Sequence, residues 1–136
     1  MNCLKVIPAV LLFLGISQAK AQSTPFKSPD KTVQCKNIKE GKFLRNGYPE
    51  EIWYMTVKDN VQTEYFNGGK NFIKSTLVFV DDCNYKAIVM EKTVKSTPIQ
   101  IGDVFNNTIT ETEKNALKIQ SKIDKKQFEL VLVKVK

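Results

Sequence analysis

The feature that most constrains the fold is an alternation of apolar and polar residues, repeated in short segments along the chain. The segments with this period-two pattern, including one that is almost continuously apolar, cover residues 41–48, 51–58, 61–66, 72–80, 83–92, 117–123 and 128–132. In the second segment Trp53, Met55 and Val57 fall on one face. Because successive side chains of a strand point to opposite faces, the pattern predicts half-buried β-strands.

Turn signals separate these segments at spacings of about 8 to 12 residues. Asp59-Asn60 and Asn67-Gly68-Gly69 contain residues that tolerate positive φ, which is typical of hairpin turns. Strands joined by short turns must be mostly antiparallel. We therefore predict an all-β domain, an antiparallel meander of about eight strands that forms a small barrel, a half-open barrel or a sandwich.

Two segments fit this pattern less clearly. Residues 99–113 are rich in β-prone side chains, but Asn106-Asn107 indicates a turn within them. Residues 111–122 have a composition that a helix would tolerate. The apolar positions Leu117, Ile119 and Ile123 fit period two better than period 3.6, so we predict a strand there.

The first 21 residues have the pattern of a secretory signal peptide. A basic start is followed by an apolar run over residues 6–16 and by the small-residue site Ala19-Lys20-Ala21. The run is too short for a membrane span, which needs about 20 residues, although a short anchor is the alternative. We expect cleavage after Ala21, a secreted or periplasmic protein with no transmembrane segment, a flexible leader over 22–32 and one domain over 33–136.

Cleavage would remove Cys3 and leave Cys35 and Cys83 as the cysteines of the mature chain. Two cysteines in an exported domain predict one disulfide. Closing a loop of 48 positions is worth about 4 kcal/mol in the chain-entropy model. The alternative is a redox pair, but such pairs usually have the Cys-x-x-Cys spacing, which is missing here.

Composition excludes several kinds of active site. The chain has no histidine, so Ser-His, Cys-His and histidine-metal sites are impossible, and three cysteines are too few for a four-cysteine zinc site. No Gly-x-Ser-x-Gly motif occurs, and Gly68-Gly69-Lys70 lacks the other residues of a phosphate-binding loop. We predict a non-enzymatic protein without catalytic residues and without a cofactor.

Asp81, Asp82 and Asn84 offer oxygen atoms to a hard cation such as Ca²⁺. Calcium needs six to eight oxygens, and Asp and Asn at a strand end commonly hydrogen-bond their own backbone. We therefore predict a polar turn and no metal site.

Paired carboxylates are the alternative route to an activity. Glu50 and Glu51 could act with Glu64 or Glu91 from a facing strand, as in glycoside hydrolysis. This hypothesis describes a small secreted hydrolase.

The chain has an excess of positive charge, and lysine carries nearly all of it. The formal net charge is +7, and it falls to +5 when Lys5 and Lys20 are removed with the signal peptide. Specific nucleic-acid recognition favours arginine, of which Arg45 is the one example, so we predict no specific nucleic-acid partner. A lysine-rich surface would instead attract an anionic envelope polymer.

Aromatic residues offer stacking platforms for a ligand beside that charge, namely Tyr48, Trp53, Tyr54 and Tyr65. The other interpretation, which we favour, places Trp53 in the core with the tyrosines around it.

Lysines also gather in the last two expected strands, on one outer surface by their spacing. They would contact envelope material or, as we prefer, guard an exposed sheet edge against pairing.

Three stretches carry a resemblance to known proteins: Cys35 followed by Gly41-Lys42-Phe43, then Gln62-Thr63-Glu64, then Asp81-Asp82-Cys83-Asn84-Tyr85. Their order resembles a group of small secreted proteins of Bacteroidota, flavobacteria in particular, with no established function. The resemblance implies a cysteine pair that bridges an early strand to a middle strand. It also suggests a distant similarity to calycin-type meanders, whose barrels hold a small apolar ligand.

These observations predict an exported β-domain that binds a small apolar ligand or an envelope component. A carboxylate hydrolase and a structural or interaction protein of the cell surface are the alternatives.

Overall fold

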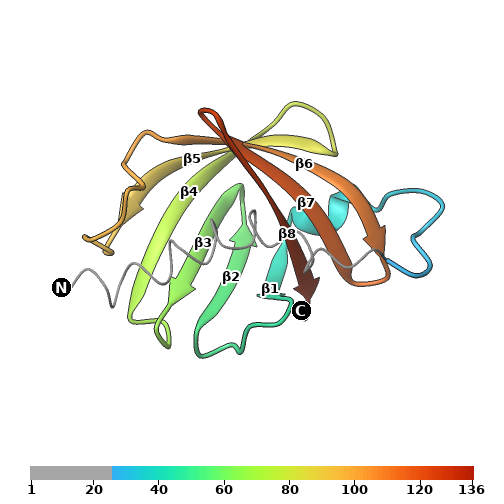
Figure 1. Cartoon of the computed structure of the whole chain (residues 1–136), viewed down its shortest axis with the longest axis horizontal. Helices are drawn as coiled ribbons and strands as arrows, with labels where there is room; N and C mark the ends of the chain where they lie inside the picture. The colour runs from blue at the N-terminus through green and yellow to red at the C-terminus, as the bar shows by residue number, and fades with distance from the viewer. Residues whose placement is uncertain (1–25) are drawn as a thin grey trace.

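Eight antiparallel strands follow one another around a closed barrel in the computed structural model, which describes residues 26–136 (Figure 1). The strands are β1 (Gly41–Arg45), β2 (Trp53–Lys58), β3 (Val61–Phe66), β4 (Asn71–Phe79), β5 (Asn84–Lys92), β6 (Val104–Glu113), β7 (Ala116–Ile123) and β8 (Lys126–Lys134). Each strand pairs with the next, and β8 pairs with β1. The prediction of an eight-stranded antiparallel all-β fold is confirmed, and the barrel is the form it takes.

Alternation along each strand decides which side chains fill the barrel. On β2 the side chains of Trp53, Met55 and Val57 are buried, as their spacing predicts. Asp59 and Asn60 both adopt positive φ, at 52° and 63°, and form the two-residue turn between β2 and β3. This short turn fixes the register, so that Glu64 pairs with Met55 and shares its inward face.

The segment that was ambiguous in the sequence forms two strands. The turn expected at Asn106-Asn107 is wrong, because both residues lie within β6 and pair with Lys86 and Tyr85 of β5. The turn comes later, at Lys114, whose φ is 56°. Strand pairing on both sides of β6 supplies hydrogen bonds that outweigh the local turn preference of asparagine.

The apolar strand β4 is covered on one side only. The side chains of Val78, near the end of the strand, and Val80, just beyond it, are 45% and 69% exposed. The inward face carries Ile73, Ser75 and Leu77, all buried. Since the barrel has a single interior, the second face of β4 points to solvent.

One end of the barrel is closed by the residues that precede β1. The 3₁₀ helix η2 (Cys35–Ile38) buries Ile38 completely and is bonded to the β4–β5 turn through the disulfide Cys35–Cys83, so the predicted disulfide is confirmed. The strand-to-strand bridge that the resemblance implied is wrong. The bridge instead joins a short helix to a turn.

Part of the predicted leader over 22–32, namely residues 26–32, is described by the structure and is hydrogen-bonded to β6. The backbone N–H of Asp30 donates to the carbonyl oxygen of Thr112 at 2.8 Å, and the Thr112 hydroxyl lies 2.7 Å from Asp30 Oδ2. Residues 26–32 form no helix or strand, yet these bonds fasten them to β6 instead of leaving them flexible. The predicted signal peptide and residues 22–25 lie outside the described residues.

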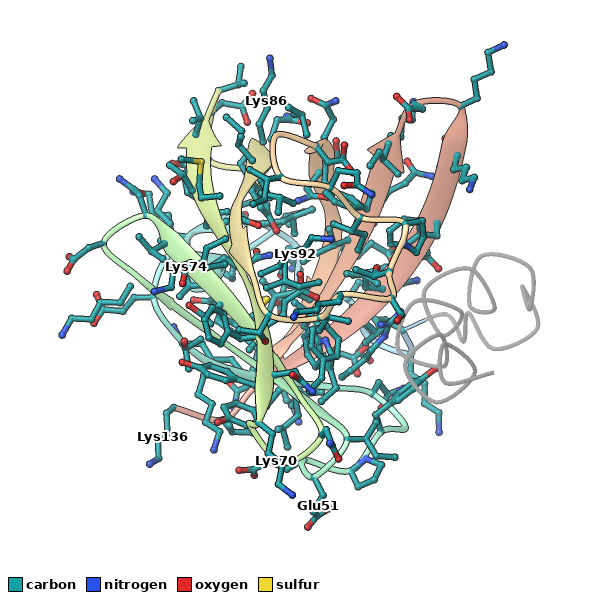
Figure 2. The ribbon with its side chains drawn as sticks, turned by 90° about the vertical axis from the view of Figure 1, so that its left-hand side faces the viewer. Glu51, Lys70, Lys74, Lys86, Lys92 and Lys136 are labelled. Carbon is teal, nitrogen blue, oxygen red and sulfur yellow. A yellow bond between two sulfur atoms is a disulfide. The ribbon has the colours of Figure 1, made fainter. Side chains whose placement is uncertain are left out.

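The other end of the barrel carries the long loop between β5 and β6, residues 93–103. This loop lies on the opposite side of the barrel from η2 in Figure 1, and it crosses the end that faces the viewer in Figure 2. Val94 and Thr97 are buried, and the Lys92 ammonium donates to the carbonyl oxygen of Ile99 at 2.8 Å. The loop is therefore packed onto the barrel.

No helix within residues 26–136 is long and apolar enough to span a membrane.

The lysines of β7 and β8 do not guard a sheet edge. Because β8 pairs with β1, the last strand has a neighbour on both sides, and that interpretation is wrong. Lys118 is buried against Glu111, at 2.9 Å between Nζ and Oε1. Lys70, Lys86 and Lys136 lie at different sides of the molecule in Figure 2, so the exposed lysines are not confined to one surface.

Candidate functional site

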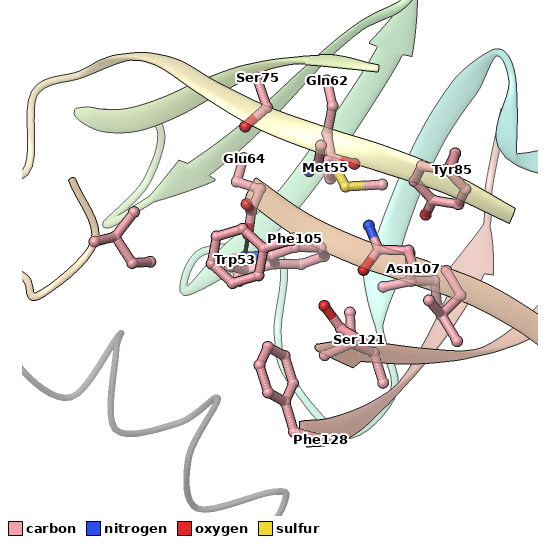
Figure 3. A pocket seen from close by; sticks show the side chains of 15 residues that line it. Trp53, Met55, Gln62, Glu64, Ser75, Tyr85, Phe105, Asn107, Ser121 and Phe128 are labelled. Carbon is pink, nitrogen blue, oxygen red and sulfur yellow. Dashed lines mark hydrogen bonds between the residues drawn. The ribbon is translucent and has the colours of Figure 1, made fainter. Parts of the chain in front are cut away.

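The interior of the barrel contains a cavity of about 40 Å³ (Figure 3). On this measure one water molecule needs about 10–15 Å³, so the space holds about three waters. Its wall is largely apolar and includes Trp53, Met55, Ala87, Ile99, Phe105, Ile119, Phe128, Leu130 and Leu132. Ile99 belongs to the loop between β5 and β6, which places the cavity next to the end of the barrel away from η2.

Six polar side chains from five strands complete the wall of the cavity. They are Gln62 and Glu64 of β3, Ser75 of β4, Tyr85 of β5, Asn107 of β6 and Ser121 of β7. Figure 3 shows these side chains directed toward the same space. Burying so many polar groups is costly unless they find hydrogen-bond partners, which makes this part of the barrel unlike an ordinary apolar core.

Glu64 is the central group of this cluster. Trp53 Nε1 donates a hydrogen bond to Glu64 Oε1 at 3.3 Å, drawn as a dashed line in Figure 3, and the Gln62 side chain also bonds the carboxylate. Burial raises the pKa of Glu64 from 4.5 to about 7, against the opposing effects of the Arg45 charge and of these two hydrogen bonds. Glu64 stays partly exposed because it faces the cavity.

Arg45 and Tyr85 are the other ionisable groups that act on Glu64. Burial lowers the pKa of Arg45 to about 10, while the electrostatic effects of Tyr48 and Glu64 raise it, so the guanidinium stays charged at neutral pH. Its central carbon lies 5.2 Å from the ring centre of Tyr48 and 6.0 Å from that of Trp53. Burial and the Glu64 charge raise the pKa of Tyr85, so its phenol is neutral.

The four aromatic residues predicted as ligand platforms do not form one surface. Trp53 is buried, as the core interpretation has it, and also lines the cavity. Tyr54 and Tyr65 point outward from β2 and β3 and stack with ring centres 4.6 Å apart, and Lys42 Nζ lies 4.8 Å from the Tyr54 ring centre. Tyr48 is half-buried against Arg45. The outer pair is thus engaged by its own neighbours.

The four glutamates of the hydrolase hypothesis are not brought together either. Glu64 points into the barrel, whereas Glu50 and Glu51 are exposed in the loop between β1 and β2. Glu91 is exposed near Lys74, at 3.9 Å between Oε1 and Nζ. Glu64 is the one carboxylate among the residues that line the cavity.

The Asp81 turn has the geometry of a self-bonded strand end. Asp81 Oδ1 accepts backbone N–H bonds from Cys83 at 2.8 Å and Asn84 at 2.9 Å. The Asn84 side chain also bonds it, and together these bonds lower the pKa of Asp81. Within residues 26–136 no group of three or more Cys, Asp or Glu side chains is placed to hold a metal ion.

Sequence reasoning missed Glu64 as an interior residue. In residues 61–66 the apolar side chains Val61 and Tyr65 alternate with Gln62 and Glu64, so hydrophobicity alone places the glutamate outside. The two-residue turn at Asp59-Asn60 was the sequence signal from which the inward position of Glu64 could have been predicted. A hairpin with that turn must pair Met55 with Glu64 and put both on the same face.

Comparison of the chain with protein-family models, with curated proteins and with solved structures found no match in any of the three. The cavity and its side chains are therefore the basis on which a function is assigned.

Proposed function

We propose that this chain is an exported, non-enzymatic protein that binds a small molecule inside its β-barrel. The observation that carries the proposal is the convergence of six polar side chains on a cavity with an otherwise apolar wall that includes three aromatic rings. Small-molecule sites combine these two elements, since the apolar wall contributes affinity and a few placed polar groups fix orientation. The expected ligand has apolar atoms and at least one hydrogen-bonding group.

The two ends of the barrel differ in a way that suits this role. One end of the barrel is closed by η2, by the disulfide and by residues 26–32, which are hydrogen-bonded to β6. At the other end the cavity is bordered by Ile99 of the loop between β5 and β6. Loops carried on a rigid scaffold are common places of ligand access. A ligand is therefore expected to enter beside this loop.

Export is supported by two independent features. The Cys35–Cys83 disulfide is typical of proteins in an oxidising compartment. The first 21 residues have the basic start, apolar run and Ala-x-Ala site of a signal peptide. Expression of the whole chain in a secreting bacterium, followed by intact-mass measurement, tests this. A protein that starts at Gln22 supports export, and an uncleaved protein retained in the cytoplasm contradicts it.

Binding is testable through Trp53, which is the only tryptophan of the chain and lines the cavity. Its fluorescence is measured against a panel of small fragments with about three to five non-hydrogen atoms, a size range set by the small cavity. Ala87→Leu adds atoms to the cavity wall, and Lys86→Leu adds an apolar side chain on the outward face of the same strand. Fragments are expected to bind the unmodified protein and Lys86→Leu, and at least tenfold more weakly to Ala87→Leu.

Two results would contradict interior binding. One is that no fragment changes the Trp53 signal of the unmodified protein. The other is that Ala87→Leu binds as tightly as Lys86→Leu. Near-ultraviolet circular dichroism shows whether Ala87→Leu keeps its packing. If it does not, Ser121→Val, which replaces a hydroxyl of the cavity wall by a side chain with one more heavy atom, takes its place.

A further inference from the structure

The charge of the cavity wall narrows the class of ligand. Among the residues that line the cavity, Glu64 is the one that can carry a full charge at neutral pH, and no described lysine or arginine is among them. This is unexpected for a chain with 21 basic and 14 acidic side chains. The cavity wall thus carries one anionic group and no cationic one, although the buried guanidinium of Arg45 acts on Glu64 from outside the wall.

The remaining acceptor capacity of Glu64 points in the same direction. A carboxylate offers about four acceptor positions. Trp53 Nε1 takes one at 3.3 Å and the Gln62 side chain bonds another, so acceptor capacity remains on a carboxylate that lines the cavity. A ligand N–H or O–H would complete the set, and an N–H of a cation forms the stronger bond with a carboxylate.

Aromatic rings surround the same space. Trp53, Phe105 and Phe128 all line the cavity, and the last two pack edge to face with ring centres 6.4 Å apart. Aromatic faces attract cations, tryptophan most strongly, and the attraction grows when the cation is removed from water. A carboxylate beside aromatic rings is therefore suited to an ammonium group with a short apolar tail.

From these three observations we propose that the barrel binds a small primary amine as its ammonium ion, with the N–H groups on Glu64 and the alkyl part among Trp53, Phe105 and Phe128. This proposal rests on interior ligand binding and names the class of ligand. The cavity holds about three waters, so the amine must be small, with about three to five non-hydrogen atoms.

The charged groups around Glu64 set how this binding depends on pH. Arg45 faces it from β1, with its guanidinium against the Tyr48 and Trp53 rings, and Tyr85 faces it from β5 as a neutral phenol. Amine binding needs the ionised carboxylate, whose pKa is about 7 in the free protein, and alkylamines stay protonated well above pH 8. The apparent affinity is therefore expected to rise about 30-fold between pH 5.5 and pH 8.

The test compares three probes with the same branched four-carbon skeleton: isobutylamine, isobutanol and isobutyrate. Each is titrated at pH 5.5 and pH 8 by isothermal calorimetry and by Trp53 fluorescence. Isobutylamine is expected to bind best at pH 8 and about 30-fold more weakly at pH 5.5. Glu64→Gln keeps the size and the acceptor oxygen of the side chain, so it should lose the preference for the amine and keep binding of isobutanol. Glu51→Gln, an exposed site, is the matched control and should change nothing.

The outcomes separate this proposal from interior binding in general. Isobutanol binding as tight as isobutylamine at pH 8 would overturn the amine assignment and leave interior binding intact. Tightest binding of isobutyrate would do the same. If none of the three probes binds, the amine assignment fails, and the fragment panel decides whether the interior binds any ligand. If Glu64→Gln does not fold, the pH profile of the unmodified protein decides, because a profile that stays level between pH 5.5 and pH 8 contradicts the amine assignment.

Discussion

Replacing Glu64 by glutamine should change how the stability of this protein depends on pH. Burial raises the pKa of Glu64 to about 7, whereas the unfolded chain has the ordinary value of 4.5. Below pH 4.5 both states are protonated and the folded state keeps its full stability. As the pH rises from 4.5 to 7 the unfolded state loses its proton first, so the free energy of unfolding falls.

The size of the effect follows from the two pKa values. The interval from 4.5 to about 7, at 1.36 kcal/mol for each pH unit, corresponds to about 3 kcal/mol. This is a large fraction of the 5–15 kcal/mol that is typical of folded domains. Glutamine does not ionise and still presents an oxygen to Trp53 Nε1. Relative to Glu64→Gln, the unmodified protein should therefore lose about 3 kcal/mol between pH 4 and pH 8.

Urea unfolding followed by Trp53 fluorescence measures this difference at pH 4, 5, 6, 7 and 8, with the disulfide kept oxidised. The chain has no histidine, so the side chain that normally titrates in the upper part of this range is missing. Glu51→Gln, at an exposed carboxylate, serves as the control and should follow the unmodified protein. The measured quantity is the difference in the free energy of unfolding between the unmodified protein and Glu64→Gln. If this difference stays constant within about 0.5 kcal/mol from pH 4 to pH 8, the argument that burial raises the pKa of Glu64 is refuted.

The disulfide, the strand closure and the outer aromatic pair each yield a further prediction. Replacing Cys35 and Cys83 together by alanine should lower the free energy of unfolding by about 2–4 kcal/mol, measured by urea unfolding, and reduction of the unmodified protein should have a similar effect. Gly41→Ala should lower the free energy of unfolding by about 1–3 kcal/mol in the same assay, because φ at Gly41 is 139° and a Cβ would overlap the carbonyl oxygen of Lys136 beside β8. An unchanged free energy of unfolding would contradict the observed closure of the barrel between β1 and β8. A double-mutant cycle of Tyr54→Ala and Tyr65→Ala, measured as free energies of unfolding, should give a coupling energy of about 0.5–1.5 kcal/mol. If the effects of the two substitutions are additive, the stacked pair contributes nothing beyond burial.

Local sequence signals predicted the individual strands well, because their causes are local. The inward positions Trp53, Met55 and Val57 follow from alternation alone, which depends only on the geometry of an extended chain. The turn at Asp59-Asn60 was recognisable because both residues tolerate the positive φ that they adopt. The turn preference of asparagine misled the prediction at Asn107, where pairing with Tyr85 holds a turn-prone residue within a strand.

The candidate site was less accessible from the sequence. The glutamate at position 64 was visible as a candidate carboxylate, but its place inside the barrel depends on the register between β2 and β3. Its polar neighbours in the cavity come from four other strands besides its own, among them Ser75, Tyr85 and Ser121, which lie 11, 21 and 57 positions further along the chain. No local pattern states that such distant residues meet, since that depends on the curvature and closure of the whole sheet.

By itself the sequence determined an all-β chain of about eight antiparallel strands, the pairing of Cys35 with Cys83 and the exclusion of histidine-dependent chemistry. These follow from side-chain alternation, turn preferences and residue counts, which act over a few positions or require no geometry. The tertiary structure alone decided that β8 returns to β1 and that residues 26–40 close one end. It also decided that Glu64 faces an interior cavity, because each of these results depends on the registers of all eight strands around the closed barrel.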